Sequence, residues 1–209
     1  IHWKATAKKG RLMANQYQDE RSQQIYNIID MGRLMEMPFD HVSLLDYAIN
    51  SSLVLSNTAL FKHDKVGMIT FNTDINTFMP AERKMKTMAD MLERLYKQET
   101  LFAESNYELL FVSIKRLIPQ RSLLIMYTNF ESLASLQRQI PNLQKLTRNH
   151  LLLIIIFENS EISEFRKKEA QSLEDIYVQT IAEKFMYDKK LILKELNKHG
   201  IISLLTRPA

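Results

Sequence analysis

The chain has 209 residues, of which 45% are hydrophobic and 25% are charged, and this suits one large domain with a well-buried core. The absence of Cys excludes disulfides, thiolate zinc sites and cysteine nucleophiles. With 28 Lys and Arg against 24 Asp and Glu the charge is mixed, and the excess of positive charge lies mainly in Lys4, Lys8, Lys9 and Arg11.

Apolar runs alternate with amphipathic stretches along the first half of the chain. Residues 25–29 are predicted as a strand that ends at Asp30 and is followed by a Gly-containing loop. Ser43 and Asp46 have capping-box spacing, and the apolar periodicity that follows predicts a helix to about residue 62. The apolar runs 66–71 and 75–79 are too close for a parallel crossover, so we expect an antiparallel hairpin that Pro80 ends.

The second half of the chain continues the alternation. The Met stripe of a helix predicted over residues 82–98 is interpreted as core filling, with a binding groove as the alternative. The unbroken apolar strand 151–157 implies a sheet that is covered on both faces. We therefore predict an α/β fold with a mostly parallel central sheet, one antiparallel edge strand and helices on both faces. The remaining predicted elements are helix 105–118, strand 121–128, helix 131–149, a helical region over 163–199 in two pieces around 170–173, and strand 201–205 after Gly200.

Motifs of the common enzyme classes are missing from the sequence. The chain has four Gly residues and no Gly-rich phosphate loop, and no Ser stands in a nucleophile elbow. Its five His residues lack the spacing of a metal site on a helix. We therefore expect a protein that is not an enzyme and has no cofactor. A nucleotide-binding or hydrolytic enzyme on a doubly wound sheet is the alternative.

Asp30 marks the candidate site, because ligands and metal ions collect at the carboxyl ends of strands in open α/β sheets. A divalent cation there needs further oxygen donors, but the alternate positions Gly32 and Leu34 offer none. Ser105 and Asn129 stand at the ends of other elements and could add a hydroxyl and an amide oxygen, although both also suit helix capping. This is a poor ligand set for Mg²⁺, so we expect weak or absent binding.

Three other residues are candidates for interactions. Arg33, in the loop after Asp30, either folds back and supplies the positive charge of a missing ion or remains solvated. Trp3 is either a buried anchor or an exposed contact, and Lys4 begins the basic segment beside it. That segment leaves open nucleic-acid binding, a partner protein or a position near the inner leaflet of a membrane.

The amino-terminal segment IHWKATAKKGRLMANQYQDER, followed by the strand IYNIIDMG, resembles the signature of bacterial domain-of-unknown-function family 58. Members of this family carry a von Willebrand factor A-like domain. The resemblance implies one such domain over residues 1–209, with a signature segment at 1–22 and an α/β core at 23–209. The matching positions are Trp3, Lys4, Ala5, Thr6, Ala7, Leu12, Glu20, Arg21 and Asp30.

The resemblance also implies a metal-ion-dependent adhesion site that has lost ligands. Gly32 and Leu34 stand at the two Ser positions of the family's Asp-x-Ser-x-Ser motif, and Asn129 stands where such domains usually have Asp. By similarity, Ser105 corresponds to the loop-borne Thr of that site. The degenerate site is therefore expected at Asp30, Ser105 and Asn129.

The family resemblance finally implies a partner and a location. Members are typically encoded beside MoxR-type AAA+ ATPases, so we expect a protein–protein interaction module in a chaperone-like or complex-assembly system. They often have membrane helices ahead of the domain, which implies the cytoplasmic face of a membrane with the anchor upstream of Ile1. The longest apolar run, Leu151–Phe157, is too short to span a bilayer. No nucleic-acid partner is expected, and the sequence leaves the oligomeric state open.

Overall fold

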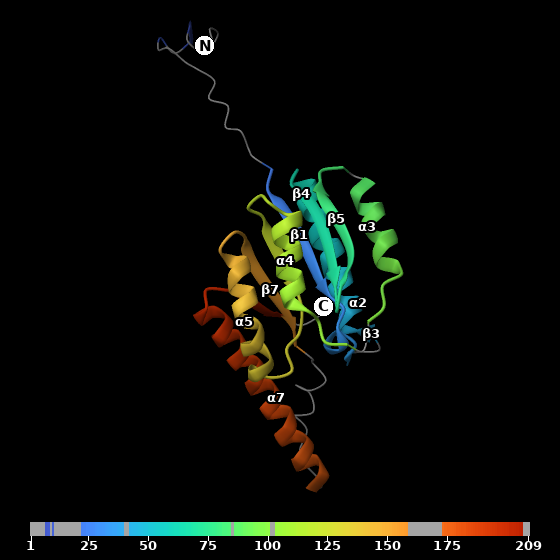
Figure 1. The fold of residues 1–209 in the computed structure, drawn as a ribbon, viewed down its shortest axis with the longest axis vertical. Helices are drawn as coiled ribbons and strands as arrows, with labels where there is room; N and C mark the ends of the chain where they lie inside the picture. Colours follow the sequence, from blue (N-terminus) through green and yellow to red (C-terminus); the bar gives the residue numbers. More distant parts are fainter. Residues whose placement is uncertain are drawn as a thin grey trace.

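The computed structural model describes residues 7–8, 10, 22–39, 42–84, 86–100, 103–158 and 173–206. Its centre is a six-stranded sheet in the order β5-β4-β1-β6-β7-β8 (Figure 1). The β4–β5 pair is antiparallel and the other neighbouring pairs are parallel, which confirms the predicted α/β fold. The strands are β1 (Gln24–Asp30), β4 (Lys65–Phe71), β5 (Ile75–Glu82), β6 (Leu123–Tyr127), β7 (Leu151–Phe157) and β8 (Ile202–Thr206).

Helices cover both faces of this sheet, as the apolar strand Leu151–Phe157 had predicted. Neighbouring strand residues point to opposite faces, so Ile28 packs toward α4, α5 and α7 while Ile29 packs toward α2 and α3. Figure 1 shows α4 and α5 in front of the sheet and α2 behind it. The helices are α2 (Leu44–Phe61), α3 (Lys86–Tyr96), α4 (Tyr107–Leu117), α5 (Leu133–Thr147) and α7 (Leu173–Lys198).

Edge strand β5 is longer than its sequence predicted, because it continues through Pro80 to Glu82. Proline is tolerated here since β5 lies at the sheet edge, and the register with β4 shifts in this stretch. The prediction that Pro80 ends the hairpin was therefore wrong, and α3 starts at Lys86 rather than at residue 82. Met91 is fully buried against α2 and the sheet, which agrees with core filling.

Local signals at two helix ends are confirmed. The capping box of Ser43 and Asp46 begins α2, and Gly200 with φ 73 follows the end of α7 before β8. Two small features were not predicted: the 3-10 turn η1 (Arg33–Met35) and the two-stranded sheet of β2 (Pro38–Phe39) and β3 (Val42–Ser43). Trp3 and Lys4 lie outside the described residues, and so does the predicted break around 170–173 except for Leu173, where α7 begins.

The parallel strands β1, β4, β6, β7 and β8 all run in the same direction. The side of the sheet where these strands finish is called its carboxyl end below, and the side where they start is called its amino end. Within the described residues, no helix has the length and apolar character needed to cross a membrane.

Candidate functional site

Asp30, the last residue of β1, lies 4% exposed at the carboxyl end of the sheet. Its Oδ1 accepts hydrogen bonds from the Ser105 hydroxyl and from the Gly32 N–H at 2.9 Å. Its Oδ2 accepts from the Tyr107 hydroxyl at 3.0 Å and from the Thr128 hydroxyl at 2.6 Å. Both oxygens of this carboxyl group are therefore occupied by donors from the chain itself.

If Asp30 is ionised, the three oxygen–oxygen contacts around its Oδ2 share only two hydroxyl protons. Tyr107, Thr128 and Oδ2 form a triangle, because the two hydroxyl oxygens are also 2.6 Å apart. Each hydroxyl donates one proton, so one of the three contacts lacks a proton unless the carboxyl group carries it. Burial raises the pKa of Asp30, while the four hydrogen bonds oppose this shift. Burial and the missing proton therefore both favour the protonated form of Asp30, compared with an Asp exposed to solvent.

Ser105 occupies the space that a side chain at position 32 would need. A Cβ built on Gly32 would collide with Ser105 Oγ and would lie 3.2 Å from both Ala103 O and Asp30 Oδ1. The hydroxyl expected from a Ser at position 32 is thus replaced by one that comes from the loop before α4. Glycine at this position allows Ser105 to reach the acid.

Asn129, two residues beyond β6, is satisfied in a different way. The Lys189 amine, which comes from α7, donates to Asn129 Oδ1 and to the Phe130 carbonyl oxygen at 2.8 Å. Lys189 is 5% exposed, and burial lowers the pKa of its amine to about 7. Its Nζ also lies 5.1 Å from the centre of the Phe185 ring. A buried amine therefore stands beside the Asn129 amide.

Arg33 turns away from Asp30. Its Nη2 lies 3.2 Å from Glu131 Oε2, in an ion pair whose two side chains are 46% and 61% exposed. The alternative in which Arg33 folds back onto Asp30 is thus not the arrangement observed, because Ser105, Tyr107 and Thr128 already surround the acid. Arg33 instead forms part of the exposed rim.

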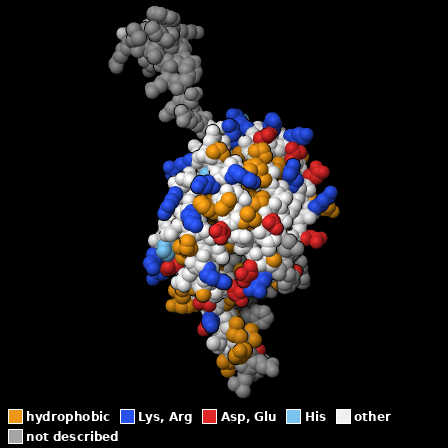
Figure 2. All heavy atoms as spheres, in the orientation of Figure 1, with side chains coloured by type: hydrophobic (Ala, Val, Ile, Leu, Met, Phe, Trp, Pro, Cys, Tyr) orange, Lys and Arg blue, Asp and Glu red, His pale blue; other side chains and the backbone are white. Residues whose placement is uncertain are grey.

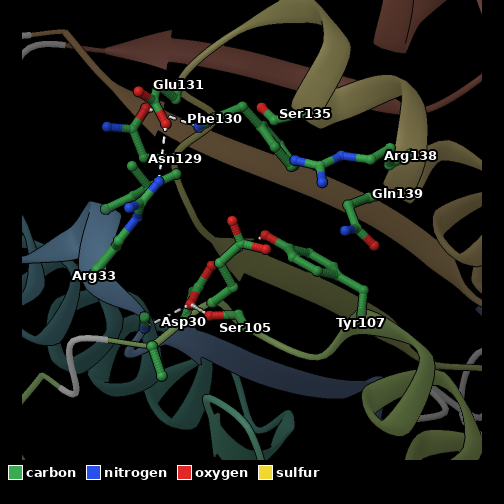
Figure 3. Close-up of a pocket in the computed structure, with 14 residues that line it drawn as sticks. Asp30, Arg33, Ser105, Tyr107, Asn129, Phe130, Glu131, Ser135, Arg138 and Gln139 are labelled. Carbon is green, nitrogen blue, oxygen red and sulfur yellow. Dashed lines mark hydrogen bonds and ion pairs between the residues drawn. The ribbon is translucent and has the colours of Figure 1, made fainter.

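A cavity of about 70 Å³ lies above these residues. Figure 3 shows Asp30, Ser105 and Tyr107 on one side of it, and Arg138 and Gln139 of α5 across from them. Its size suits a few water molecules or one polar side chain from outside. The cavity brings the three predicted residues Asp30, Ser105 and Asn129 to one place, together with Arg33 and Glu131.

The helix-capping interpretations of Ser105 and Asn129 were wrong. Asn106 is the N-cap of α4 and accepts a hydrogen bond from the Leu109 N–H at 3.0 Å. Ser132 is the N-cap of α5, where it forms a capping box with Ser135. Each helix starts later than predicted, and this leaves Ser105 and Asn129 free to take part in the site.

Sequence reasoning missed Tyr107, Thr128 and Lys189. Thr128 directly follows the strand Leu123–Tyr127, beside the position of Asn129, so strand-end reasoning could have found it. Tyr107 is the first residue of α4 and resembles an ordinary core aromatic in sequence. Lys189 is one of many Lys residues in a long amphipathic helix, and no local signal distinguishes it.

The residues present do not fit the metal ion that the adhesion-site motif implies. Magnesium requires several free oxygen ligands in near-octahedral geometry, but here the acid oxygens accept hydrogen bonds and Asn129 Oδ1 accepts from an amine. A protonated Lys189 would also repel a dication. In the described part of the chain, no group of three or more His, Cys, Asp or Glu side chains is placed to hold a metal.

The family assignment follows from a match over most of the chain. The family model described as "Protein of unknown function DUF58" matches residues 1–163. The chain belongs to the DUF58 family. No curated protein matches this DUF58 chain.

The α/β fold of this DUF58 domain is also found in solved structures. BatB, a conserved hypothetical protein from Bacteroides thetaiotaomicron, is similar with a TM-score of 0.56 and 14% identity, over 90% of this chain and 92% of that chain. The SpRpn10 VWA domain has a TM-score of 0.49 and 9% identity, over 90% of each chain. An aerotolerance-related membrane protein from Bacteroides fragilis has a TM-score of 0.48 and 15% identity, over 65% of this chain and 67% of that chain.

Proposed function

We propose that this DUF58 domain is a non-catalytic protein–protein interaction module whose adhesion-site position works without a metal ion. The observation that carries the proposal is the set of donors on Asp30, since both carboxyl oxygens accept hydrogen bonds from the chain itself. A fully bonded buried acid stabilises the loops around the cavity and offers no free charge to a dication.

The rim of the cavity supplies a surface for a partner. The exposed ion pair of Arg33 and Glu131 stands on one side, and the exposed Arg138 stands on α5. Interfaces that form and dissociate have polar rims, and Arg is enriched in such interfaces relative to the rest of the surface. Solvent-exposed ion pairs contribute little to stability, so these side chains can exchange their contacts for those of a partner at little cost.

The partner in this proposal is a MoxR-type AAA+ ATPase, in a chaperone-like or complex-assembly system at the cytoplasmic face of a membrane. Membership of the DUF58 family supports this choice, since family members are typically encoded beside such ATPases. The domain would act as an adaptor, and the chemistry of the system would belong to the ATPase.

Calorimetric titration with Mg²⁺, Mn²⁺ and ATP tests the absence of metal-dependent and catalytic chemistry. We expect no heat beyond that of dilution for each ligand. A Gly32→Ser/Leu34→Ser/Asn129→Asp variant, which restores the motif, provides a comparison for the metal titrations. Tight binding of Mg²⁺ or turnover of ATP by the wild-type chain would overturn the proposal.

Binding of the purified ATPase tests the partner. Arg138→Glu should weaken the complex by at least about fivefold, the effect of losing one interface contact of about 1 kcal/mol. Arg148→Glu, an equal charge change just beyond the other end of α5, should leave binding unchanged. EDTA should have no effect on the complex. Loss of binding in EDTA, or equal effects of the two substitutions, would contradict a metal-free site at the cavity.

A further inference from the structure

The amino end of the sheet carries a group of unpaired positive charges. The starts of the parallel strands meet the last turns of α2, α4 and α5 there, because each helix runs back to the start of the next strand. Five exposed cations at this end are called the basic face below: Lys62, Lys115, Arg116, Arg121 and Arg148. In the described part of the chain, no hydrogen bond or ion pair joins the side chains of these five residues to another residue.

Acidic side chains at the same end are engaged by the chain itself. Asp64 accepts a hydrogen bond from the Gln23 N–H at 2.9 Å, and Glu82 pairs with Lys84 at 3.0 Å. Glu195 lies 3.6 Å from the Lys198 amine and 3.2 Å from the His199 ring. The basic face is therefore not neutralised. Figure 2 shows Lys and Arg side chains over the upper part of the molecule, where the strands begin in Figure 1.

Exposed apolar side chains lie among these cations. Phe61, the last residue of α2 and the neighbour of Lys62, is 69% exposed. Leu151 and Ile202, the first residues of β7 and β8, are 47% and 49% exposed. Cations combined with exposed apolar groups are typical of surfaces that lie in the headgroup region of a bilayer.

We propose that the basic face binds the surface of a bilayer that contains anionic phospholipids, with Phe61 inserted among the headgroups. Anionic lipids attract clustered Lys and Arg, and the apolar side chains add contact below the phosphate level. Nucleic acids also attract cations, but proteins that hold single strands stack bases on several aromatic rings. Leu151 and Ile202 are aliphatic and offer no such platform, so a lipid surface fits this end better.

This binding mode is independent of the function proposed for the cavity. The cavity lies at the carboxyl end of the sheet, opposite the basic face, so a domain bound to a bilayer would turn it toward the solvent. A protein partner and a membrane could then be bound at the same time. Failure of ATPase binding would leave the lipid proposal intact, and the reverse also holds.

Co-sedimentation of the full 209-residue chain with vesicles tests the proposal. We expect binding to vesicles of equimolar phosphatidylglycerol and phosphatidylcholine, weakening as NaCl is raised, and no binding to phosphatidylcholine alone. The triple variant Arg116→Glu/Arg121→Glu/Arg148→Glu should lose about a hundredfold in affinity, since each of the three basic residues contributes about fivefold. This variant keeps the basic amino-terminal segment, so its loss reports on the basic face.

A matched control separates position from net charge. Lys97→Glu/Lys184→Glu/Lys190→Glu changes net charge equally, at exposed positions outside the basic face, and should keep wild-type binding. Circular dichroism should show that both triple variants are folded. Equal loss in the two variants, or full binding by the basic-face variant, would overturn the proposal.

Phe61 provides a second measurement that does not depend on charge. Phe61→Ala should weaken vesicle binding severalfold without changing its dependence on salt, while Phe61→Leu should retain most of it. Unchanged vesicle binding by Phe61→Ala would show that Phe61 does not insert among the headgroups, and would overturn that part of the proposal. Salt-dependent binding of DNA or RNA that is lost in the basic-face triple variant, without binding to anionic vesicles, would overturn the membrane assignment.

Discussion

Buried ionisable groups at the carboxyl end of the sheet are bonded within the chain, whereas a group of exposed cations at the amino end is not. At the carboxyl end, Asp30 is buried and bonded by hydroxyl groups, and Lys189 is buried and bonded to an amide and a carbonyl oxygen. At the amino end, Arg116 and Arg121 are exposed and have no partner in the described part of the chain. Buried polar groups are bonded internally and serve the fold, whereas exposed unpaired charges remain available to an external partner. The net charge of +4 does not distinguish the buried, bonded groups from the exposed cations.

Removing the buried acid should have the largest effect. Asp30→Ala leaves the Ser105, Tyr107 and Thr128 hydroxyls and the Gly32 N–H without their acceptor. We expect the free energy of unfolding to fall by about 3 to 5 kcal/mol, because unbonded buried polar groups are costly. Urea denaturation at pH 7 measures this loss.

Asp30→Asn is the matched control for that substitution. An amide has the shape of a protonated carboxyl group, and its NH₂ can donate to Tyr107 and Thr128 while its oxygen accepts from Ser105. We expect this variant to be about as stable as the wild type. A loss as large as that of Asp30→Ala would show that the negative charge itself is required, and would argue against a protonated acid.

The position of Asp30 could be predicted from the sequence because it depends on local pattern. An apolar strand followed by an acid and a Gly-containing loop indicates a strand end in an α/β sheet, and the structure places Asp30 there. The strand Leu151–Phe157 was predicted with its observed bounds for the same reason. Periodicity within one element was sufficient for both.

The partners of these site residues could not be predicted, because they come from distant parts of the chain. Tyr107 and Lys189 are separated from the residues they bond by 77 and 60 positions. Capping rules were also misleading, since Asn106 and Ser132 compete for the N-cap positions that Ser105 and Asn129 were expected to fill. Choosing among neighbouring polar residues requires the tertiary contacts that hold each loop.

Lys189 should make stability depend on pH. Its folded pKa is about 7, whereas an unfolded Lys titrates near 10.4, so between these values the unfolded state binds more protons. Stability should therefore rise from pH 7 to pH 9.5, by about 3 kcal/mol from this group, and this gain should be lost as pH falls to 7. Urea denaturation at a series of pH values in this window measures the slope.

Two variants isolate the contribution of Lys189. Lys189→Met should flatten the rise in stability with pH, because the titrating amine is gone. Lys190→Met changes an exposed neighbour and should keep the wild-type slope. Identical slopes for all three proteins would mean that the buried amine does not titrate in this range and that its burial leaves the stability independent of pH.

A smaller effect is expected where Gly32 meets Ser105. Gly32→Ser should cost about 1 to 3 kcal/mol, because its Cβ collides with Ser105 Oγ, and Ser105→Ala should cost about 1 kcal/mol through one lost hydrogen bond. The double variant removes the collision and returns a hydroxyl near Asp30, so it should cost less than the two changes added together. A double-mutant cycle from urea denaturation measures this coupling. Additive costs would show that the two positions do not compete for one space.

The basic face should give the smallest change in stability. Arg116→Ala and Arg121→Ala remove exposed side chains that have no partner in the described part of the chain, so each should alter the free energy of unfolding by less than about 0.5 kcal/mol. The same thermal or urea experiments that detect Asp30→Ala should thus leave these variants indistinguishable from the wild type. A loss of about 1 kcal/mol or more would assign these cations to the fold. Retained stability together with weakened vesicle binding would instead assign Arg116 and Arg121 to a binding surface. A residue that the fold does not need can change a binding affinity without changing a melting curve.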